Sequence, residues 1–219
     1  MDTAKNPTQK PTQDTSQDPV QSSAIILASA SSSRADLLAQ AGVEVMQMPA
    51  QVDESEIKAS MKAEGQSASD VAEVLAELKA IRVSQLFPDA LVIGADQMLT
   101  CQSEWFDKPT DMDHAQAHLL ALQGKSHDLI TSTCLAQQGR RIWHDQDRAT
   151  LTMRTLSHSF ISFYLNLVGD KALNSVGAYQ IEGMGAQLFS QVDGDFFTIR
   201  GLCLLPLLEM LRRHGVVPR

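Results

Sequence analysis

The sequence predicts an α/β fold with a mixed, twisted sheet and flanking helices. Early in the chain, apolar runs typical of buried strands at residues 25–28 and 91–95 are separated by helical patterns. Later, Gln-Gly at 138–139 and Asp-Gly at 193–194 lie between apolar segments, which is typical of antiparallel hairpins. Of the 219 residues, 43% are hydrophobic, so the chain can bury a sizeable core.

Residues 1–23 differ in composition from the rest. They are rich in Thr, Gln, Asp, Ser and Pro and contain no aromatic residue. Such a stretch cannot bury enough apolar surface to offset the entropy lost on ordering. We therefore expect a disordered leader over residues 1–23 and a single folded domain over residues 24–219.

The first predicted elements alternate between strand and helix. Gly42 and Pro49 are typical of the ends of a helix and a strand, respectively. Asp70 and Glu73 are spaced as a capping box at the start of a longer helix. In order, we expect a strand at 25–28, a helix at 34–41, a strand at 43–48, a helix at 70–86 and a strand at 91–95.

The later elements are mostly strands. Gly124 ends a predicted helix, and Ser157 begins another. The hairpin signals at 138–139 and 193–194 each require a strand on either side. We expect a helix at 111–122, strands at 129–135, 141–144 and 149–155, a helix after Ser157, strands at 188–192 and 196–199, and a helix at 206–214.

Composition excludes several classes of partner. Aromatic residues are only 5% and the formal net charge is −8, which argues against binding a nucleic-acid polymer. No apolar run approaches the roughly 18 residues of a membrane span. Three well-separated cysteines, without a C-x-x-C pair, indicate reduced thiols in a cytoplasmic protein.

The loop after the first strand is a candidate anion site. A loop that opens a helix presents backbone N–H groups, which favour phosphate. Ser29 and Ser31 add hydroxyl groups, and Arg34 adds a guanidinium fork that suits phosphate oxygens. The alternative is a serine-rich helix cap with a surface arginine.

Asp96 directly follows the predicted strand at 91–95, where open α/β sheets place their ligands. Its carboxylate could bind Mg²⁺ or accept a proton from water. The alternative is an aspartate in a turn at the end of the strand. Gln97 comes next in the chain.

Other residues give weaker signals. Glu54 belongs to an acidic loop that could hold a hard cation, and Lys108 precedes a rigid proline and could hold phosphate. Lys79 lies on the predicted helix at 70–86, where it could also be a surface lysine. Glu182 lies among glycines that allow close backbone approach, and it could accept hydrogen bonds from a base.

Two motifs are set aside. His114 and His118 have the i, i+4 spacing of metal ligands but lack the glutamate of H-E-x-x-H, so we expect a solvated helix face. Residues 126–128 read Ser-His-Asp, but neighbours in a strand point to opposite faces and cannot form a relay.

The order of these signals resembles the Maf family of nucleoside triphosphate pyrophosphatases. The matching segments, over about residues 24 to 215, are Leu-Ala-Ser-x-Ser with Arg34, Val-Asp-Glu at 52–54, Leu-x-x-x-Lys-Ala at 75–80, Gly-Ala-Asp-Gln at 94–97, Asp-Lys-Pro at 107–109, Gly-Ala-Tyr-x-Ile-Glu-Gly at 177–183, and Asp-Gly-Asp-Phe-Phe-x-x-x-Gly-Leu at 193–202.

The resemblance implies a fold similar to the inosine-triphosphate pyrophosphatases, with two lobes around a cleft. It implies cleavage of a nucleoside triphosphate to monophosphate and pyrophosphate, with Mg²⁺ or Mn²⁺. Asp96 would be the catalytic acceptor, with Glu54 as the second metal-side carboxylate and Lys79 as a third catalytic residue that faces the triphosphate. The remaining assignments are Ser29, Ser31, Arg34 and Lys108 on the triphosphate, and Gln97 and Glu182 near base and sugar.

This chain departs from the usual pattern of the family. The family commonly reads Ser-Pro-Arg-Arg, whereas Ser33 replaces the first arginine here, and Ser175-Val176 stand where a lysine often precedes Gly-Ala-Tyr. Gln97 with Glu182 looks more like the 7-methyl-GTP branch, although the tryptophan which that branch carries near Ser33 is absent.

Two other functions compete with that of an enzyme. The first is regulation of cell division, or septum formation, through protein contacts, with which the family is also associated. The second is a nucleotide sensor without turnover, but binding an anion gains nothing from carboxylates unless a metal is present. The sequence leaves open the preferred base and the formation of a homodimer.

Overall fold

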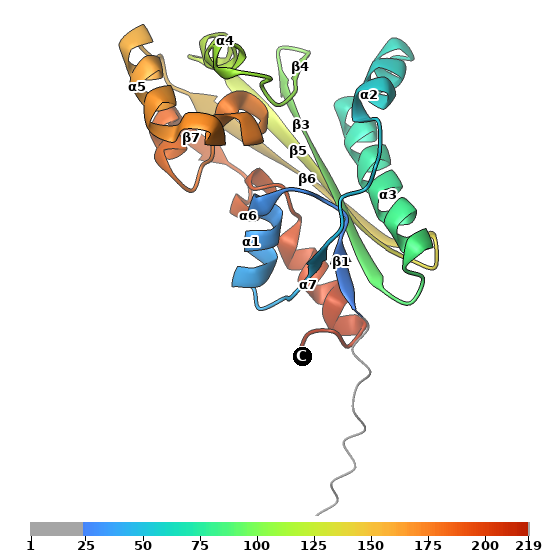
Figure 1. The fold of residues 1–219 in the computed structure, drawn as a ribbon. Coiled ribbons are helices and arrows are strands. Elements are labelled where there is room, and N and C mark those ends of the chain that lie inside the picture. Colours follow the sequence, from blue (N-terminus) through green and yellow to red (C-terminus); the bar gives the residue numbers. More distant parts are fainter. Residues whose placement is uncertain (1–23, 219) are drawn as a thin grey trace, which may run out of the picture.

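A computed structural model describes residues 24–218 of the chain. Within them lies a seven-stranded mixed sheet of order β2-β1-β3-β5-β6-β7, with β4 paired to β3 (Figure 1). Strand β1 is parallel to β2 and β3, and the later neighbours are antiparallel. The predicted fold class is therefore confirmed, while the predicted leader at 1–23 lies outside the described residues.

The bounds of the elements are as follows. The strands are β1 (Ile25–Leu27), β2 (Met46–Gln47), β3 (Leu91–Cys101), β4 (Glu104–Phe106), β5 (Ser126–Gln137), β6 (Arg140–Met153) and β7 (Phe189–Asp193). The α-helices are α1 (Ser32–Gln40), α2 (Glu54–Ala63), α3 (Ala68–Leu86), α4 (Met112–Leu122), α5 (His158–Val168), α6 (Phe196–Ile199) and α7 (Leu204–Arg213). Short 3₁₀ turns fill Gly169–Asn174, Val176–Ala178 and Met184–Leu188.

Alternation along β3 gives the sheet two different faces. Val92 packs toward α3, which covers one face together with α2. Ile93 points to the opposite face, where α1 and α7 cover one end and α4 and α5 cover the other. Figure 1 shows α1 and α7 at a different place along the sheet from α4 and α5. Among the described residues, no helix is both long and apolar enough to span a membrane.

Several predicted elements are confirmed with different bounds. The turn at 138–139 is a tight hairpin with positive φ at both central residues, 52° and 72°, as a type I′ turn requires. Strand β3 continues through Asp96, which therefore lies inside a strand and not at its end. The separately predicted strands at 141–144 and 149–155 are one strand, β6.

Three sequence predictions were wrong. Residues 196–199 form helix α6 and not a strand, because the Asp195 side chain accepts hydrogen bonds from two backbone N–H groups and caps a helix. The acidic segment at 53–54 opens helix α2, with Asp53 as its cap. Ser67 caps α3, so that Asp70, and not Glu73, closes the capping box.

Gly94 allows α3 to lie directly against β3. A Cβ atom at this position would lie 2.2 Å from the carbonyl oxygen of Ala76 and 2.7 Å from the Cβ of Ala80. Small residues on both elements therefore set the depth at which α3 packs. Asp96 comes two residues after Gly94 on β3, and Lys79 comes three residues after Ala76 on α3.

Replacing Gly94 by alanine should destabilise the fold. The clash is with backbone, which cannot rotate away, and overpacking of this kind costs about 1–3 kcal/mol. Urea unfolding of Gly94→Ala measures the loss, with Ala59→Ser, at an exposed position of α2, as the control. Unchanged stability in Gly94→Ala would show that α3 can shift at no cost.

His127 of β5 is buried against Tyr179. Its Nε2 lies 2.7 Å from the Tyr179 hydroxyl group, and its Nδ1 is buried without a partner among the described residues. Burial lowers the pKa of His127 to about 4, and the nearby Asp128 charge offsets this only in part. The folded protein therefore holds this imidazole neutral.

Stability should fall as the pH drops from about 6.5 toward 4. The pKa of His127 is lower in the folded state than in the unfolded state. Its contribution to the free energy of unfolding is therefore complete above the unfolded-state pKa and is lost as the pH falls through the folded-state pKa. The loss is roughly 3 kcal/mol, at about 1.4 kcal/mol per pKa unit. Urea unfolding at pH 7 and pH 4.5 measures it.

The variant His127→Gln should remove most of this pH dependence, because its side chain does not titrate. His158→Gln, at an exposed position, should keep it. An equal pH dependence in all three proteins would assign the effect elsewhere, for example to His118, whose pKa is lowered by burial and by the His114 charge.

Candidate active site

A cavity of about 680 Å³ opens at an exposed edge of the central strand. Strand β1 ends at Leu27, opposite Ile93, and β4 pairs with β3 only from Leu99 onward. Between these two pairings the edge of β3 is free, and the loop that follows β1 turns away into α1. Side chains from both faces of β3 can therefore reach the same cavity.

The cavity is lined by every residue that the sequence predicts for the site. These are Ser29, Ser31, Arg34, Glu54, Lys79, Asp96, Gln97, Lys108 and Glu182. They come from the loop after β1, from α2, α3 and β3, from the loop after β4, and from the segment after Ala178. The structure thus brings together segments that lie far apart in the sequence.

At the centre of the cavity, Lys79 bridges two carboxylates. Its Nζ lies 2.7 Å from Asp96 Oδ1 and 2.7 Å from Glu54 Oε1. Lys79 and Asp96 are buried, so the surface alternative for Lys79 was wrong. Burial raises the pKa of Glu54, but the charges of Lys79, Lys58 and Arg34 outweigh it and the net shift is downward.

The second oxygen of Asp96 has no partner. Asp96 Oδ2 is buried and accepts no hydrogen bond from any described residue. A buried carboxylate oxygen without a donor is costly unless a ligand, a cation or water satisfies it. This atom is therefore a candidate contact for a ligand or a cation.

The guanidinium of Arg34 is fixed by the protein at one side of the cavity. Its Nε donates to the Gly201 carbonyl at 2.8 Å and its Nη1 donates to Ser29 Oγ at 3.0 Å. Ser31 caps α1, as the structural alternative for this loop supposed, and it also lines the cavity. Burial lowers the pKa of Arg34, while the charges of Asp96 and Glu54 raise it.

Lys58 is a site residue that the sequence reasoning missed. It lies on α2, one turn after Glu54, lines the cavity, and donates to Asp107 Oδ1 at 2.6 Å. Had α2 been predicted, the i, i+4 spacing of Glu54 and Lys58 would have placed both on one face. Partial burial and the charge of Arg34 lower the pKa of neighbouring Lys108, while the charges of Glu54 and Asp96 partly offset this.

Gln97 lies on the opposite face of β3 from Asp96. Its amide nitrogen donates to Thr131 Oγ1 at 2.8 Å and to the Thr198 carbonyl at 2.9 Å. The side-chain nitrogen thus holds α6 against the sheet, and the amide oxygen is the group left for a ligand.

Glu182 has one charged partner within the described residues. Its Oε1 lies 3.2 Å from Arg200 Nε, and the Arg200 side chain is only 8% exposed. The Ser33 hydroxyl group donates to the Arg200 carbonyl at 3.3 Å, which links Ser33 to the same end of the cavity. Arg200 also lines the cavity and was not singled out from the sequence.

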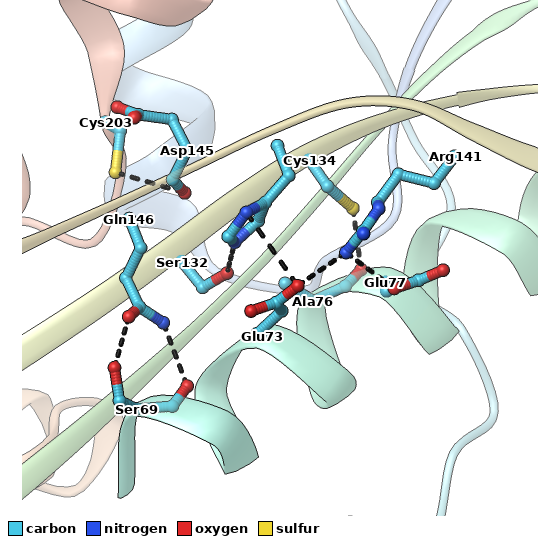
Figure 2. Close-up of polar contacts among 11 residues, drawn as sticks. Ser69, Glu73, Ala76, Glu77, Ser132, Cys134, Arg141, Asp145, Gln146 and Cys203 are labelled. Carbon is cyan, nitrogen blue, oxygen red and sulfur yellow. Dashed lines mark hydrogen bonds and ion pairs between the residues drawn. The ribbon is translucent and has the colours of Figure 1, made fainter.

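A second polar cluster lies under α3, away from the cavity (Figure 2). Ser132 Oγ lies 2.9 Å from His144 Nε2, and His144 Nδ1 lies 3.9 Å from Glu73 Oε1, which also pairs with Arg141. These residue types resemble a hydrolase triad. However, Ser132 is completely buried, so the cluster joins α3 to the β5–β6 hairpin.

The motifs that the sequence analysis set aside also lie outside the cavity lining. His118 is buried and its ring packs edge-on against Phe106, so a fully solvated helix face was wrong. His127 of the Ser-His-Asp run contacts Tyr179 and not its sequence neighbours. Within the part of the chain that the structure describes, no group of three His, Cys, Asp or Glu residues could hold a metal unaided.

Comparison with known proteins gives consistent matches. A nucleoside triphosphate pyrophosphatase of Paramagnetospirillum magneticum is 53% identical over 190 residues, covering 87% of this chain and 98% of that one. A 7-methyl-GTP pyrophosphatase of Mesorhizobium japonicum is 51% identical over 193 residues, covering 88% and 97%. A solved dITP/XTP pyrophosphatase of Mycobacterium abscessus aligns with a TM-score of 0.43 at 15% identity, covering 86% and 96%.

The model of the family described as Maf-like protein matches residues 24–214, which include all the cavity-lining residues. The order of motifs read from the sequence and this match agree. The chain belongs to the Maf family.

Proposed function

We propose that this chain is an enzyme that hydrolyses nucleoside triphosphates to nucleoside monophosphate and pyrophosphate with the help of a divalent cation. The observation that carries the proposal is the unpartnered Asp96 Oδ2 in a cavity that also holds several cationic side chains. A relative at 53% identity bears the name of this activity, and one at 51% bears the name of its 7-methyl-GTP form.

The triphosphate would lie between Arg34, Lys58 and Lys108, which line the same side of the cavity. Their charges suit phosphate oxygens and would stabilise a pyrophosphate leaving group. Partial burial and nearby positive charge lower the pKa of Lys108, and a bound phosphate would favour its protonated form again. Cleavage would break the bond between the α-phosphorus and its bridging oxygen.

Asp96 would act on the attacking water. Its free Oδ2 could accept the proton as the water oxygen bonds to the α-phosphorus, and pyrophosphate would leave with the bridging oxygen. Lys79 holds Oδ1 at 2.7 Å, and thereby fixes the direction in which Oδ2 points. Lys79 would thus position the base.

The same carboxylates fit a divalent cation. Hard cations take oxygen ligands, and Asp96 and Glu54 each have one oxygen that Lys79 does not contact. Residues 24–218 supply no third acidic ligand beside them, so phosphate oxygens of the substrate would be needed as further ligands. When bound, Mg²⁺ or Mn²⁺ neutralises charge on the phosphates.

The test is a panel of canonical and modified nucleoside triphosphates, including 7-methyl-GTP, with Mg²⁺, Mn²⁺ or EDTA. We expect equimolar pyrophosphate and monophosphate, and loss of both with EDTA. Release of single phosphates would contradict the cleavage position. Tight binding without any release would instead favour the nucleotide-sensor reading.

Replacing Asp96 by asparagine should lower turnover at least about a hundredfold, the lower end for a general base. The amide is nearly isosteric, and Lys79 keeps Glu54 as a partner, so the variant should remain folded. The assay is pyrophosphate release, with circular dichroism to confirm the fold and Asp113→Asn of α4 as a surface control. Normal turnover in Asp96→Asn would remove this residue from the mechanism.

Replacing Glu182 by glutamine should change which base is preferred. A carboxylate only accepts hydrogen bonds, which suits the adjacent N–H donors of guanine, whereas an amide suits the mixed edge of uracil or thymine. We expect the ratio of kcat/KM for UTP or dTTP over GTP to rise roughly tenfold, as one hydrogen bond to a charged group allows. An equal change for all nucleotides would show that Glu182 does not contact the base.

A further inference from the structure

We propose that Arg200 sets the charge at the base-binding end of the cavity, and that it makes the site favour an uncharged guanine base over the positively charged 7-methylguanine base. The proposal rests on the proposed function, because it assumes that the base lies beside Glu182. It concerns a specificity-determining residue at an unspecified position (x) of the motif at 193–202.

Arg200 is placed for this role by its position and burial. It follows α6 directly, and its side chain is 8% exposed while still lining the cavity. Its Nη1 donates to Gln40 Oε1 at 3.4 Å and its guanidinium lies over the Phe196 ring. The side chain is therefore held in place from two sides, so its charge cannot easily move away from Glu182.

The ion pair changes what Glu182 offers to a ligand. A carboxylate alone would attract a base that carries positive charge, as 7-methylguanine does. Here Arg200 Nε lies 3.2 Å from Glu182 Oε1, so a guanidinium already offsets the negative charge. A second cation brought to the same carboxylate would be repelled by Arg200 at short range.

The geometry also leaves a hydrogen-bond donor free. Although Arg200 Nε is close to Glu182, its N–H is not aimed at the carboxylate, and this buried donor has no acceptor among the described residues. The N7 and O6 atoms of guanine are the acceptors that arginine recognises best on a base. Methylation at N7 removes one of these acceptors, so charge and hydrogen bonding act in the same direction.

The experiment compares Arg200→Met, which has no charge, with Arg200→Lys, which retains it. The control is Arg148→Met, an exposed residue of β6 paired with Asp128. For each protein, kcat/KM is measured for GTP and 7-methyl-GTP with Mg²⁺, and Kd is measured by calorimetry for GMP and 7-methyl-GMP. Circular dichroism confirms that each variant is folded.

We expect the preference for 7-methyl-GTP over GTP to rise at least tenfold in Arg200→Met, which corresponds to about 1.4 kcal/mol. The same shift should appear in the ratio of the Kd values. In Arg200→Lys and Arg148→Met the ratio should stay within about threefold of the wild-type value. An unchanged ratio in Arg200→Met, or one that moves toward GTP, overturns the proposal.

Two other outcomes separate this proposal from the proposed function. If the wild-type protein binds both monophosphates but cleaves no triphosphate, the hydrolase assignment fails, and the Kd ratio alone decides the role of Arg200. If Arg200→Met weakens GTP and 7-methyl-GTP equally, Arg200 contacts the phosphates or supports the fold, and the charge proposal fails while the hydrolase assignment stands.

Discussion

The contact between Lys79 and Asp96 depends on how closely α3 approaches β3. Both side chains are buried, and their charged atoms lie 2.7 Å apart. Removing Lys79 would leave the buried Asp96 carboxylate without its charge partner, which in proteins costs about 3–5 kcal/mol, whereas Lys79 without Asp96 would keep Glu54. The approach is possible because Gly94 has no side chain where the Ala76 carbonyl lies. The Asp96 carboxylate, its ammonium partner and the helix packing are thus one structural unit.

The free edge of β3 explains why the site combines such different groups. Adjacent strand residues point to opposite faces, so Asp96 and Gln97 would normally belong to separate layers. Because β1 ends early and β4 begins late, both side chains reach the same cavity from the edge. Asp96 then faces the cations and carboxylates of α2 and α3, and Gln97 faces α6 and the segment that carries Glu182.

The two ends of the cavity differ in charge balance. Around Lys79, four cationic side chains outnumber three carboxylates: Arg34, Lys58, Lys79 and Lys108 against Glu54, Asp96 and Asp107. At the other end, Glu182 and Arg200 form a pair whose charges offset each other. Such a cavity suits a ligand with concentrated negative charge on one side and a nearly neutral, hydrogen-bonding group on the other.

Local sequence signals predicted most of the elements of this protein, and the nine predicted site residues all line one cavity. Apolar runs, helix caps and the Gln-Gly turn act over a few residues, so they can be recognised without knowledge of the fold. They failed where a local signal had two meanings. Asp193-Gly194 predicted a hairpin turn, but the next residue, Asp195, caps α6, and the acidic segment at 53–54 predicted a loop but opens α2. Lys58 was missed because α2 was not predicted.

Only the tertiary structure decided how these residues meet. No spacing along the chain relates Lys79 to Glu54, or Arg200 to Glu182, because long-range packing sets those distances. The burial of Asp96 within a continuous strand, its unpartnered oxygen, and the free edge of β3 likewise exist only once the sheet is assembled. The sequence determined which chemical groups are present, and the packing of α3 and α6 against the sheet decided their charge partners.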